Sequence, residues 1–600
     1  MWTGYFPIGH TVEPEYNLDR DQVTRWVRDV MQTPNIPKLY ANSLYDIGNC
    51  TDDSIYTTGE IHDVQFAEAL LSEDENVDLD ALGEKYLGKG KETNRLYAWC
   101  ADAYGGDVNG AQRSNIYRAS PRIVGPYAEE DSRMLYPILQ KQLTQLNKEG
   151  LVDLYRMECE LVILLIRMRI EGITIDMPYA EKLYGEVTSI IHQKQAQIKA
   201  TTGVSVADSA PSGDIAKVFD ACGIPYRITP KTKKPSITDD DLKIIVHPAG
   251  ALCRELRQHD KVRGTFIRNG LLESSVNGVL HGEFHPLRGM RGGARTGRFA
   301  SSNPNLQNIP VRTELGKLIR KAYIPNPGHL CWEDDDFSQY EYRILAHFAV
   351  GPGSDELRAE YCNDPNTDYH TRTTGMIKSS AYHAYQRWEA QGLDGGKIRK
   401  RVKTINFGLM NAMGIDLLAA ELGISKNEAA PLLEVYHTAN PYVKATIKDC
   451  EQFAQANGFI TTFLGRKRRF NLWEPRPEWD EETRTFAKQT PLRYHHAIRV
   501  YGPMIHRAMT HIALNSRTQG TNADGMKKSM VLAHKAGIFD VTGVPKLTVH
   551  DSLSFSVIDD TPIQREAFKE LRHIMETALA LRVPVRVDSE RGPNWGDLHA

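Results

Sequence analysis

Long apolar runs, paired cysteines and an excess of one charge are all missing from this 600-residue sequence. Its longest purely aliphatic run covers residues 161–166 and ends at Arg167, far short of the ~20 apolar residues that cross a bilayer. The eight cysteines include no Cys-x-x-Cys pair, which argues against a disulfide framework and a cysteine zinc site. The first residues have neither the basic segment nor the apolar core of a secretory signal. We therefore expect a cytoplasmic protein with reduced thiols and no membrane contact.

The composition has none of the biases of a fibrous or disordered chain. Hydrophobic residues make up 41% and charged residues 25% of the sequence, and the mean hydropathy is -0.44. At roughly 150 residues per domain, this length predicts about four modules with separate cores.

Charge gives two opposing signals. The 73 basic and 76 acidic residues give a net charge of -3, which by itself argues against a nucleic-acid partner. Local basic clusters argue for phosphate binding, although a solvated helix face is the alternative for each of them. The clusters are Arg288, Arg291, Arg295 and Arg298; Lys397, Arg399, Lys400, Arg401 and Lys403; and Arg466, Lys467, Arg468 and Arg469.

No internal repeat or low-complexity tract divides the chain, so we infer domain boundaries from changes of period. Residues 1–148 mix short strand-like and helical pieces and are predicted to form one α/β module. From Leu151 an apolar helical period runs to Ile170, and a second domain is expected to begin in this region. Residues 251–272 are typical of an exposed amphipathic helix, and a Gly/Arg-rich loop follows at 289–297.

Carboxylates lie in two segments that alternate as half-buried strands do. The first runs from Leu330 to Asp336, and the second, residues 547–555, carries Asp551 near its middle. If the two strands pair, Asp336 and Asp551 come within a few ångströms, although 215 residues separate them in the sequence. Two neighbouring carboxylates suit Mg²⁺, which takes its other ligands from water and substrate phosphates. For Asp551 alone, an ordinary solvated or ion-paired carboxylate is the alternative.

Residues 397–409 are predicted to form a helix within a mostly helical insertion between the two strands. Arg399, Lys403 and Phe407 share one face of this helix because they are four residues apart. The two cations could hold a triphosphate, and the ring could stack on the attached base or sugar. The alternative is a basic surface helix with Phe407 in the core.

Six ordered motifs make the chain similar to the family A DNA polymerases, the DNA polymerase I type, and most like their phage members. Residues 154–176 also resemble the start of that polymerase domain, and Lys261 with Thr265-Phe266 resembles its thumb helix. The six motifs are the stretch Thr296-Gly297-Arg298 to Asn308-Ile309-Pro310; Asp336-Phe337-Ser338-Gln339-Tyr340-Glu341-Tyr342-Arg343; Asp368-Tyr369-His370-Thr371; Arg399-x-x-x-Lys403-Thr404-Ile405-Asn406-Phe407-Gly408; Gln519-Gly520-Thr521-Asn522-Ala523-Asp524; and Val549-His550-Asp551.

The resemblance implies an α+β polymerase "right hand" of palm, fingers and thumb, preceded by an α/β exonuclease-like module. Its activity would be template-directed DNA synthesis, which adds deoxynucleotides to a primer 3′ end with two Mg²⁺ ions. Its partners would be primer-template DNA, deoxynucleoside triphosphates and replication accessory proteins, and a phage-encoded chain would act in the host cytoplasm. The implied ranges are 1–148 for a truncated 3′-5′ exonuclease-like domain and 149–600 for the polymerase domain, with the thumb at about 180–285, the palm at about 286–365 and 500–600, and the fingers at about 366–500.

The resemblance also implies a role for each matching residue. Asp336 and Asp551 would bind the metal ions, and Lys403 would protonate the departing pyrophosphate. Glu341 would act as a steric gate against a 2′-hydroxyl. The nucleotide would contact Arg399, Lys403, Phe407, His370, Gln339 and Glu341. The DNA would contact Lys261 through its backbone and, through minor-groove acceptors common to all base pairs, Arg298, Asn515, Gln519 and His550.

The sequence departs from the family pattern at several positions. Asn411 and Ala412 stand where Tyr-Gly is common, so we expect altered template handling. Ser552 replaces the acid that usually follows Asp551, an accessory group, so we expect activity to survive. Two further segments, around 382–396 and 471–494, enlarge the region between the motifs.

The N-terminal module resembles a 3′-5′ exonuclease domain through Asn42-x-x-x-Asp46 and Tyr127-x-x-x-Asp131. The Asp-x-Glu pair that the resemblance requires on the opening strand is absent, and we expect no preceding 5′-nuclease domain. An ion held by Asp46 and Asp131 alone would be weakly bound. We therefore expect no exonuclease activity and a module that supports the polymerase domain or completes a site with another polypeptide.

Three other functions compete with DNA synthesis. A single-subunit RNA polymerase would share the two carboxylates and the basic helix, but Glu341 and the exonuclease-like module favour deoxynucleotides. A catalytically silent DNA-binding relic would not need the carboxylate pair together with Arg399 and Lys403. A metal-dependent nuclease would need four exonuclease carboxylates, and the sequence offers two.

Overall fold

A computed structural model describes residues 3–91, 93–287, 294–310, 313–380, 382–410, 413–476, 479–480, 485–486 and 489–598. Asn411 and Ala412, most of the Gly/Arg-rich loop with Arg288 and Arg291, and part of the segment around 471–494 lie outside these residues.

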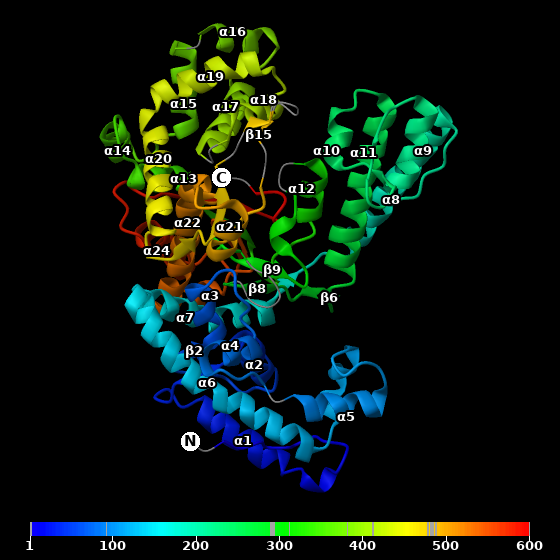
Figure 1. The fold of residues 1–600 in the computed structure, drawn as a ribbon, viewed down its shortest axis with the longest axis vertical. Coiled ribbons are helices and arrows are strands. Elements are labelled where there is room, and N and C mark those ends of the chain that lie inside the picture. The colour runs from blue at the N-terminus through cyan, green and yellow to red at the C-terminus, as the bar shows by residue number, and fades with distance from the viewer. Residues whose placement is uncertain are drawn as a thin grey trace.

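The N-terminal module is mainly helical and lies below the rest of the chain (Figure 1). Its two strands, β1 (Lys38–Tyr40) and β2 (Ile61–Asp63), pair in parallel. The Asp63 carboxylate accepts backbone N–H groups of Ser43 at 2.6 Å and Gln65 at 2.8 Å, which explains where two of the helices begin. The helices are α1 (Arg20–Met31), α2 (Ser43–Asp52), α3 (Val64–Leu71), α4 (Leu79–Leu87), α5 (Asn94–Tyr104) and α6 (Pro121–Glu149), with 3₁₀ turns at Pro14–Tyr16 and Ala111–Arg118.

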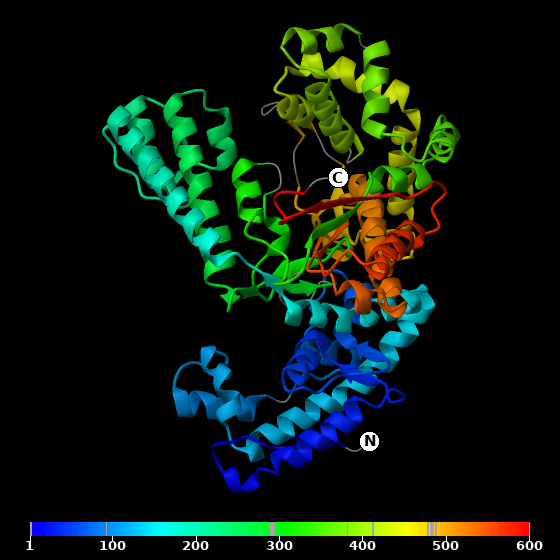
Figure 2. The same cartoon turned by 180° about the vertical axis from the view of Figure 1, so that it is seen from behind.

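A helical lobe rises on one side of the molecule in both views (Figures 1 and 2). The predicted helix at 251–272 is α-helical to Lys261 and continues as a π-helix over Val262–Leu272. The buried α7 (Val152–Glu171) leads into this lobe, whose members are α8 (Met177–Thr202), α9 (Ser212–Cys222), α10 (Asp239–Ile244) and α11 (Pro248–Lys261). Inside the lobe, β4 (Arg227–Ile228) and β5 (Pro235–Ser236) form a hairpin between α9 and α10. Other short strands connect the lobe to the centre: β3 (Ile173–Thr174), β6 (Ser275–Val276), β7 (Val279–Leu280), β8 (Glu283–His285) and β9 (Ala300–Ser302), followed by a 3₁₀ turn at Leu306–Asn308 and α12 (Glu314–Arg320).

The central sheet is antiparallel with the strand order β18-β19-β10-β20. Glu333 and Asp335 lie two residues apart on one face of β10 and are fully buried. Arg572 contacts both carboxylates, at 2.8 and 3.2 Å, and Arg591 pairs with Glu333 at 2.6 Å, so two guanidinium groups balance the two buried carboxylates. The strands are β18 (Leu547–Val549), β19 (Ser552–Val557), β10 (Cys331–Phe337) and β20 (Val587–Gly592), and helices α13 (Tyr340–Phe348), α22 (Ala513–Lys535), α23 (Ile538–Thr542) and α24 (Pro562–Thr577) lie around the sheet.

A second helical lobe faces the first across the central sheet and has its own hydrophobic core (Figure 1). It contains α14 (Ser354–Asn363), α15 (Tyr369–Ser380), α16 (Tyr382–Ala390), α17 (Gly395–Met410), α18 (Ile415–Leu422), α19 (Lys426–Ala439) and α20 (Pro441–Asn457). The chain returns to the sheet through β11 (Phe459–Thr461), β12 (Lys467–Arg469), β13 (Leu472–Pro475), β14 (Trp479–Asp480), β15 (Thr485–Phe486), β16 (Leu492–Arg493), α21 (Tyr494–Tyr501), β17 (Ile505–Arg507) and a 3₁₀ turn at Thr510–Ile512.

The basic cluster at 466–469 does not form the free phosphate-binding patch that its sequence suggests. Arg468 pairs with Glu73 at 2.6 Å, and Arg469 pairs with Glu149 at 2.6 Å. Both glutamates belong to the N-terminal module, so these residues join the module to the β11-β12 hairpin.

A buried ionic network lies beside this junction. Glu158 of α7 contacts the ammonium of Lys527 at 2.8 Å and also pairs with Arg466, which reaches Asp524 at 2.7 Å. Glu158, Asp524 and Lys527 have no exposed surface, so two buried anions balance two buried cations. In the part of the chain that the structure describes, no helix is long and apolar enough to span a membrane.

Candidate active site

Asp336 and Asp551 meet at one end of the central sheet. The prediction of one continuous strand over 547–555 is wrong. Val549 pairs with Ser552, so His550-Asp551 forms the turn of a hairpin, and His550 has a φ of 59°. Asp336 pairs with Ser552 on the neighbouring strand, and the N–H of Phe337 donates to the carbonyl oxygen of Asp551 at 3.1 Å. The predicted pairing of the two carboxylate segments is therefore confirmed, with Asp551 held in the tight turn.

The surroundings of the two carboxylates are strongly acidic. Desolvation by the surrounding protein atoms, followed by the charge of Asp551, raises the pKa of Asp336, although the residue is still in contact with solvent. Burial, followed by the charge of Glu341, raises the pKa of Asp551 to about 6. Because neighbouring negative charges destabilise one another, a cation bound here would relieve the repulsion.

The donor set fits a hard divalent ion. Asp588 lies directly across from Asp336 on β20, and Glu590 stands two residues further along the same strand. Both add negative charge that raises the pKa of Asp336. Among the described residues no group of three or more His, Cys, Asp or Glu side chains forms a ready-made metal site, so water and substrate oxygens would have to complete the coordination.

The face of α17 predicted from Arg399, Lys403 and Phe407 is present in the structure and lies beside His370. The Lys403 ammonium lies 5.8 Å from the centre of the Phe407 ring, and the two rings of Phe407 and His370 are 6.1 Å apart. Burial, opposed by the charge of Asp368 and assisted by the charges of Lys403 and Arg399, lowers the pKa of His370 to about 4. His370 is therefore neutral at physiological pH, and its Nδ1 can accept the amide of Asn406 at 2.9 Å.

Gln339 connects this basic helix to the carboxylates. Its Nε2 donates to Asp368 at 3.0 Å and its Oε1 accepts the backbone N–H of Tyr369 at 2.9 Å. Asp368 in turn pairs with Arg399. A chain of direct contacts therefore runs from Gln339, three residues after Asp336, through Asp368 to the guanidinium of Arg399 on α17.

Glu341 and Arg298 form an ion pair at 2.6 Å, with 13% and 24% of their side chains exposed. Burial raises the pKa of Glu341, and Arg298 opposes that rise. Arg298 also lowers the pKa of Asp551, so the pair lies beside the carboxylate centre.

The other expected DNA contacts lie on two separate elements. Asn515 and Gln519 are one turn apart on α22 and share a face, while His550 is exposed in the hairpin turn beside Asp551. Partial burial lowers the pKa of His550, and the nearby charge of Arg298 lowers it further. Lys261 ends α11 on the first helical lobe and lines a cavity of about 390 Å³ with Thr265 and Phe266.

The exonuclease-like residues are not gathered around a shared acidic site. The Lys91 ammonium pairs with Asp131 at 2.7 Å and also donates to the Tyr127 hydroxyl at 2.9 Å. Asn42 precedes α2, and burial together with the charge of Asp63 raises the pKa of Asp46 to about 6. Asp63 itself is engaged in the helix caps described above.

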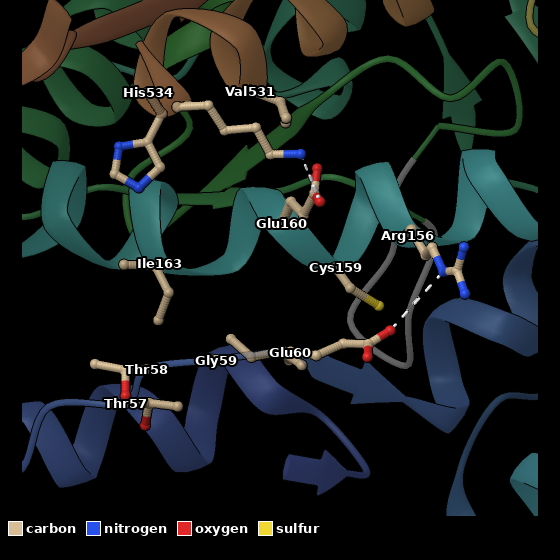
Figure 3. Close-up of a pocket in the computed structure, with 12 residues that line it drawn as sticks. Thr57, Thr58, Gly59, Glu60, Arg156, Cys159, Glu160, Ile163, Val531 and His534 are labelled. Carbon is tan, nitrogen blue, oxygen red and sulfur yellow. Dashed lines mark hydrogen bonds and ion pairs between the residues drawn. The ribbon is translucent and has the colours of Figure 1, made fainter. Parts of the chain in front are cut away.

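A larger cavity of about 540 Å³ lies between the module and the helices α7 and α22 (Figure 3). Its charged groups are paired internally, Glu60 with Arg156 at 3.8 Å and Glu160 with Lys535 at 2.7 Å. Sixteen residues of α22 separate Gln519 from Lys535, which is about 24 Å along a helix. This cavity is therefore separate from the carboxylate centre.

Several contacts near the site leave no signal in the sequence. Asp588 and Glu590 alternate on a strand, but nothing in the sequence indicates that this strand lies beside Asp336. Lys91 lies in a loop with no recognisable motif, so its contact with Asp131 could not be anticipated. Asp368 stands within a recognised motif, yet its contact with Arg399 joins residues 31 positions apart.

Comparison with known proteins gives a consistent result along nearly the whole chain. Residues 177–597 match the model of DNA polymerase family A, and residues 9–147 match a 3′-5′ exonuclease model. A DNA-directed DNA polymerase of Pseudomonas phage M6 is 30% identical over 99% of this chain and 88% of its own length. DNA polymerase DpoZ of Salmonella phage PMBT28 is 28% identical over 97% of this chain and 91% of its own.

Bacterial proteins are similar as well. DNA polymerase I of Pseudomonas aeruginosa is 28% identical over 99% of this chain, which spans 60% of that relative. The fold matches the POL domain of Pol1 from M. smegmatis, solved in complex with a DNA primer-template and dNTP, with a TM-score of 0.73, 24% identity and coverage of 98% of this chain and 90% of that one. The predicted right-hand fold with an N-terminal exonuclease domain is thereby confirmed.

Proposed function

The chain belongs to DNA polymerase family A, and we propose that Asp336 and Asp551 are the catalytic centre with which it carries out template-directed DNA synthesis. The observation that carries this proposal is the pairing of β10 with β19, which brings the two carboxylates together beside the hairpin turn. The contacts through Gln339 and Asp368 lead from the end of β10 to Arg399 of α17.

Asp336 and Asp551 would hold two Mg²⁺ ions, with Asp588 and Glu590 adding negative charge around them. When bound, the ions would activate the primer 3′-hydroxyl and offset the charge that develops on the pyrophosphate. The two carboxylates must be deprotonated for this role, which the raised pKa values make harder in the absence of a cation.

The cations of α17 act on the other side of the reacting phosphate. Arg399 and Lys403 bind the triphosphate, and Lys403 gives a proton to the leaving pyrophosphate. His370 is neutral, so it contributes a hydrogen bond rather than a charge. Phe407 stacks on the nucleotide and Gln339 orients the motif around Asp368.

Two groups of residues select the sugar of the incoming nucleotide and contact the DNA. Glu341 excludes a 2′-hydroxyl, and its pairing with Arg298 fixes the carboxylate in the site. Arg298, Asn515, Gln519 and His550 contact the minor groove at the primer terminus, and Lys261 contacts the DNA backbone from the first lobe.

Primer extension on templates of defined sequence tests this function. The expected product follows the template, needs a primer and a divalent metal, and forms with deoxynucleotides far better than with ribonucleotides. Primer-independent RNA synthesis would instead support an RNA polymerase, and DNA binding without extension would support a silent relic.

We also propose that the N-terminal module does not hydrolyse DNA and instead supports the polymerase domain. The ammonium of Lys91 neutralises Asp131, where a nuclease would need a metal ion. The Glu73 and Glu149 carboxylates of the module bind the β11-β12 hairpin, which favours a supporting role.

Digestion of single-stranded DNA and of a mismatched primer tests the proposal. No removal of the 3′ nucleotide is expected under conditions of rapid extension, for the parent chain or for Lys91→Ala. Digestion that disappears in Asp131→Ala would overturn the proposal.

A further inference from the structure

We propose that Asp368 is an internal anion that holds Arg399 until the nucleotide triphosphate displaces it, so that Asp368 weakens nucleotide binding. The inference rests on the proposed role of Arg399 in binding the triphosphate. Asp368 forms an ion pair with Nη2 of Arg399, and Nε of the same guanidinium donates to the Thr371 hydroxyl at 3.3 Å. The guanidinium is therefore engaged before any nucleotide arrives.

The carboxylate of Asp368 is fixed by two groups besides Arg399. Gln339 Nε2 donates to it at 3.0 Å, and the backbone N–H of Thr371 donates to its other oxygen. Gln339 is held in turn because its Oε1 accepts the N–H of Tyr369 at 2.9 Å. Burial raises the pKa of Asp368, but the hydrogen bonds from Arg399 and Thr371 outweigh this effect and lower it below its usual value, so Asp368 is charged at neutral pH.

Arg399 and Lys403 differ in this respect although they share one face of α17. Arg399 is paired, whereas Lys403 forms no ion pair with any residue in the described ranges and lies near the Phe407 ring. A triphosphate that binds this face competes with Asp368 for Arg399 but can contact Lys403 directly. Asp368 consequently opposes only one of the two cationic contacts.

Removing the charge of Asp368 has a predictable sign. Arg399 is 45% and Asp368 26% exposed, so the pair has the modest strength of a largely solvated ion pair. We expect the loss of this competition for Arg399 to strengthen nucleotide binding about two- to tenfold.

Asp368→Asn is the appropriate variant because Asp368 also caps α15 (Tyr369–Ser380) through the Thr371 N–H. Asparagine keeps an acceptor at this position and is an equally good helix cap. Asp364→Asn is the matched control: Asp364 is exposed four residues earlier, accepts the N–H of Asn366 and forms no ion pair in the part of the chain that is described.

The experiment measures the KM for a correct deoxynucleotide and its Kd in a complex with a dideoxy-terminated primer. Asp368→Asn should lower both values about two- to tenfold, Asp364→Asn should leave them unchanged, and in an Arg399→Ala background Asp368→Asn should have less than about a twofold effect. An unchanged or raised Kd in Asp368→Asn would overturn the inference and make Asp368 a residue that positions Arg399. Absence of extension by the parent chain would instead refute the proposed function.

Discussion

Glu158→Gln should destabilise the protein far more than the neighbouring substitution Glu160→Gln. Glu158 is completely buried between Lys527 and Arg466, so glutamine at this position leaves two buried cations facing Asp524 alone. Glu160 lies on the same helix two residues later, where 39% of its side chain is exposed and it pairs with Lys535 at 2.7 Å. The two substitutions are chemically identical and differ only in surroundings.

The expected magnitudes follow from burial. Breaking a buried ion pair by removing one partner costs about 3–5 kcal/mol because an uncompensated charge stays inside. An exposed pair contributes about 0–1 kcal/mol. Glu158→Gln should therefore lower the free energy of unfolding by about 3 kcal/mol or more beyond the effect of Glu160→Gln.

Equilibrium urea unfolding followed by tryptophan fluorescence and circular dichroism measures this difference. The double variant Glu158→Gln/Lys527→Met removes one charge of each sign, so it should be less destabilised than the sum of its single changes. Equal losses for Glu158→Gln and Glu160→Gln, or strict additivity in the double variant, would refute the reasoning about the network.

Three further predictions concern the two sites. Glu341→Ala should raise kcat/KM for ribonucleotides relative to deoxynucleotides by about tenfold or more, since the gate is gone; an unchanged ratio would remove Glu341 from that role. Lys403→Ala should lower kcat strongly as well as raise KM in single-turnover kinetics, because a general acid acts in the transition state; a change in KM alone would leave Lys403 only a phosphate contact. Asp46 has a folded pKa raised to about 6, so its contribution to stability is present below about pH 4 and is lost as the pH rises to 6. Asp46→Asn should consequently gain up to about 3 kcal/mol over the parent between pH 4 and 7, with or without Mg²⁺, and stabilisation of the parent alone by Mg²⁺ would reveal a metal site.

The sequence predicts the main elements of the site because they depend on local pattern. The alternation around Asp336 indicates a strand, and the spacing of Arg399, Lys403 and Phe407 indicates one helical face. The turn at His550-Asp551 was not foreseen, since an alternating pattern continues on both sides of it. A residue in a left-handed conformation within a hairpin leaves no clear signal unless it is Gly, Asn or Asp.

Contacts between distant segments set the limit of that reasoning. The basic cluster at 466–469 has the composition of a phosphate site, but its partners Glu73 and Glu149 lie more than 300 residues earlier. Local charge patterns cannot distinguish a free cation from one that meets a distant carboxylate. For the same reason the sequence does not predict the contact between Lys91 and Asp131, which depends on how the loop that carries Lys91 packs against α6.

The most direct test of the account is the behaviour of Asp336→Asn and Asp551→Asn in primer extension and primer-template binding at saturating Mg²⁺. Each substitution should reduce the single-turnover rate of incorporation by several powers of ten, because it removes a ligand of the metal ions that act in the transition state. The Kd for primer-template should change less than about threefold, and Asp559→Asn, an exposed control, should match the parent in both assays. Incorporation by either catalytic-centre variant at close to the parental rate would contradict the assignment of Asp336 and Asp551.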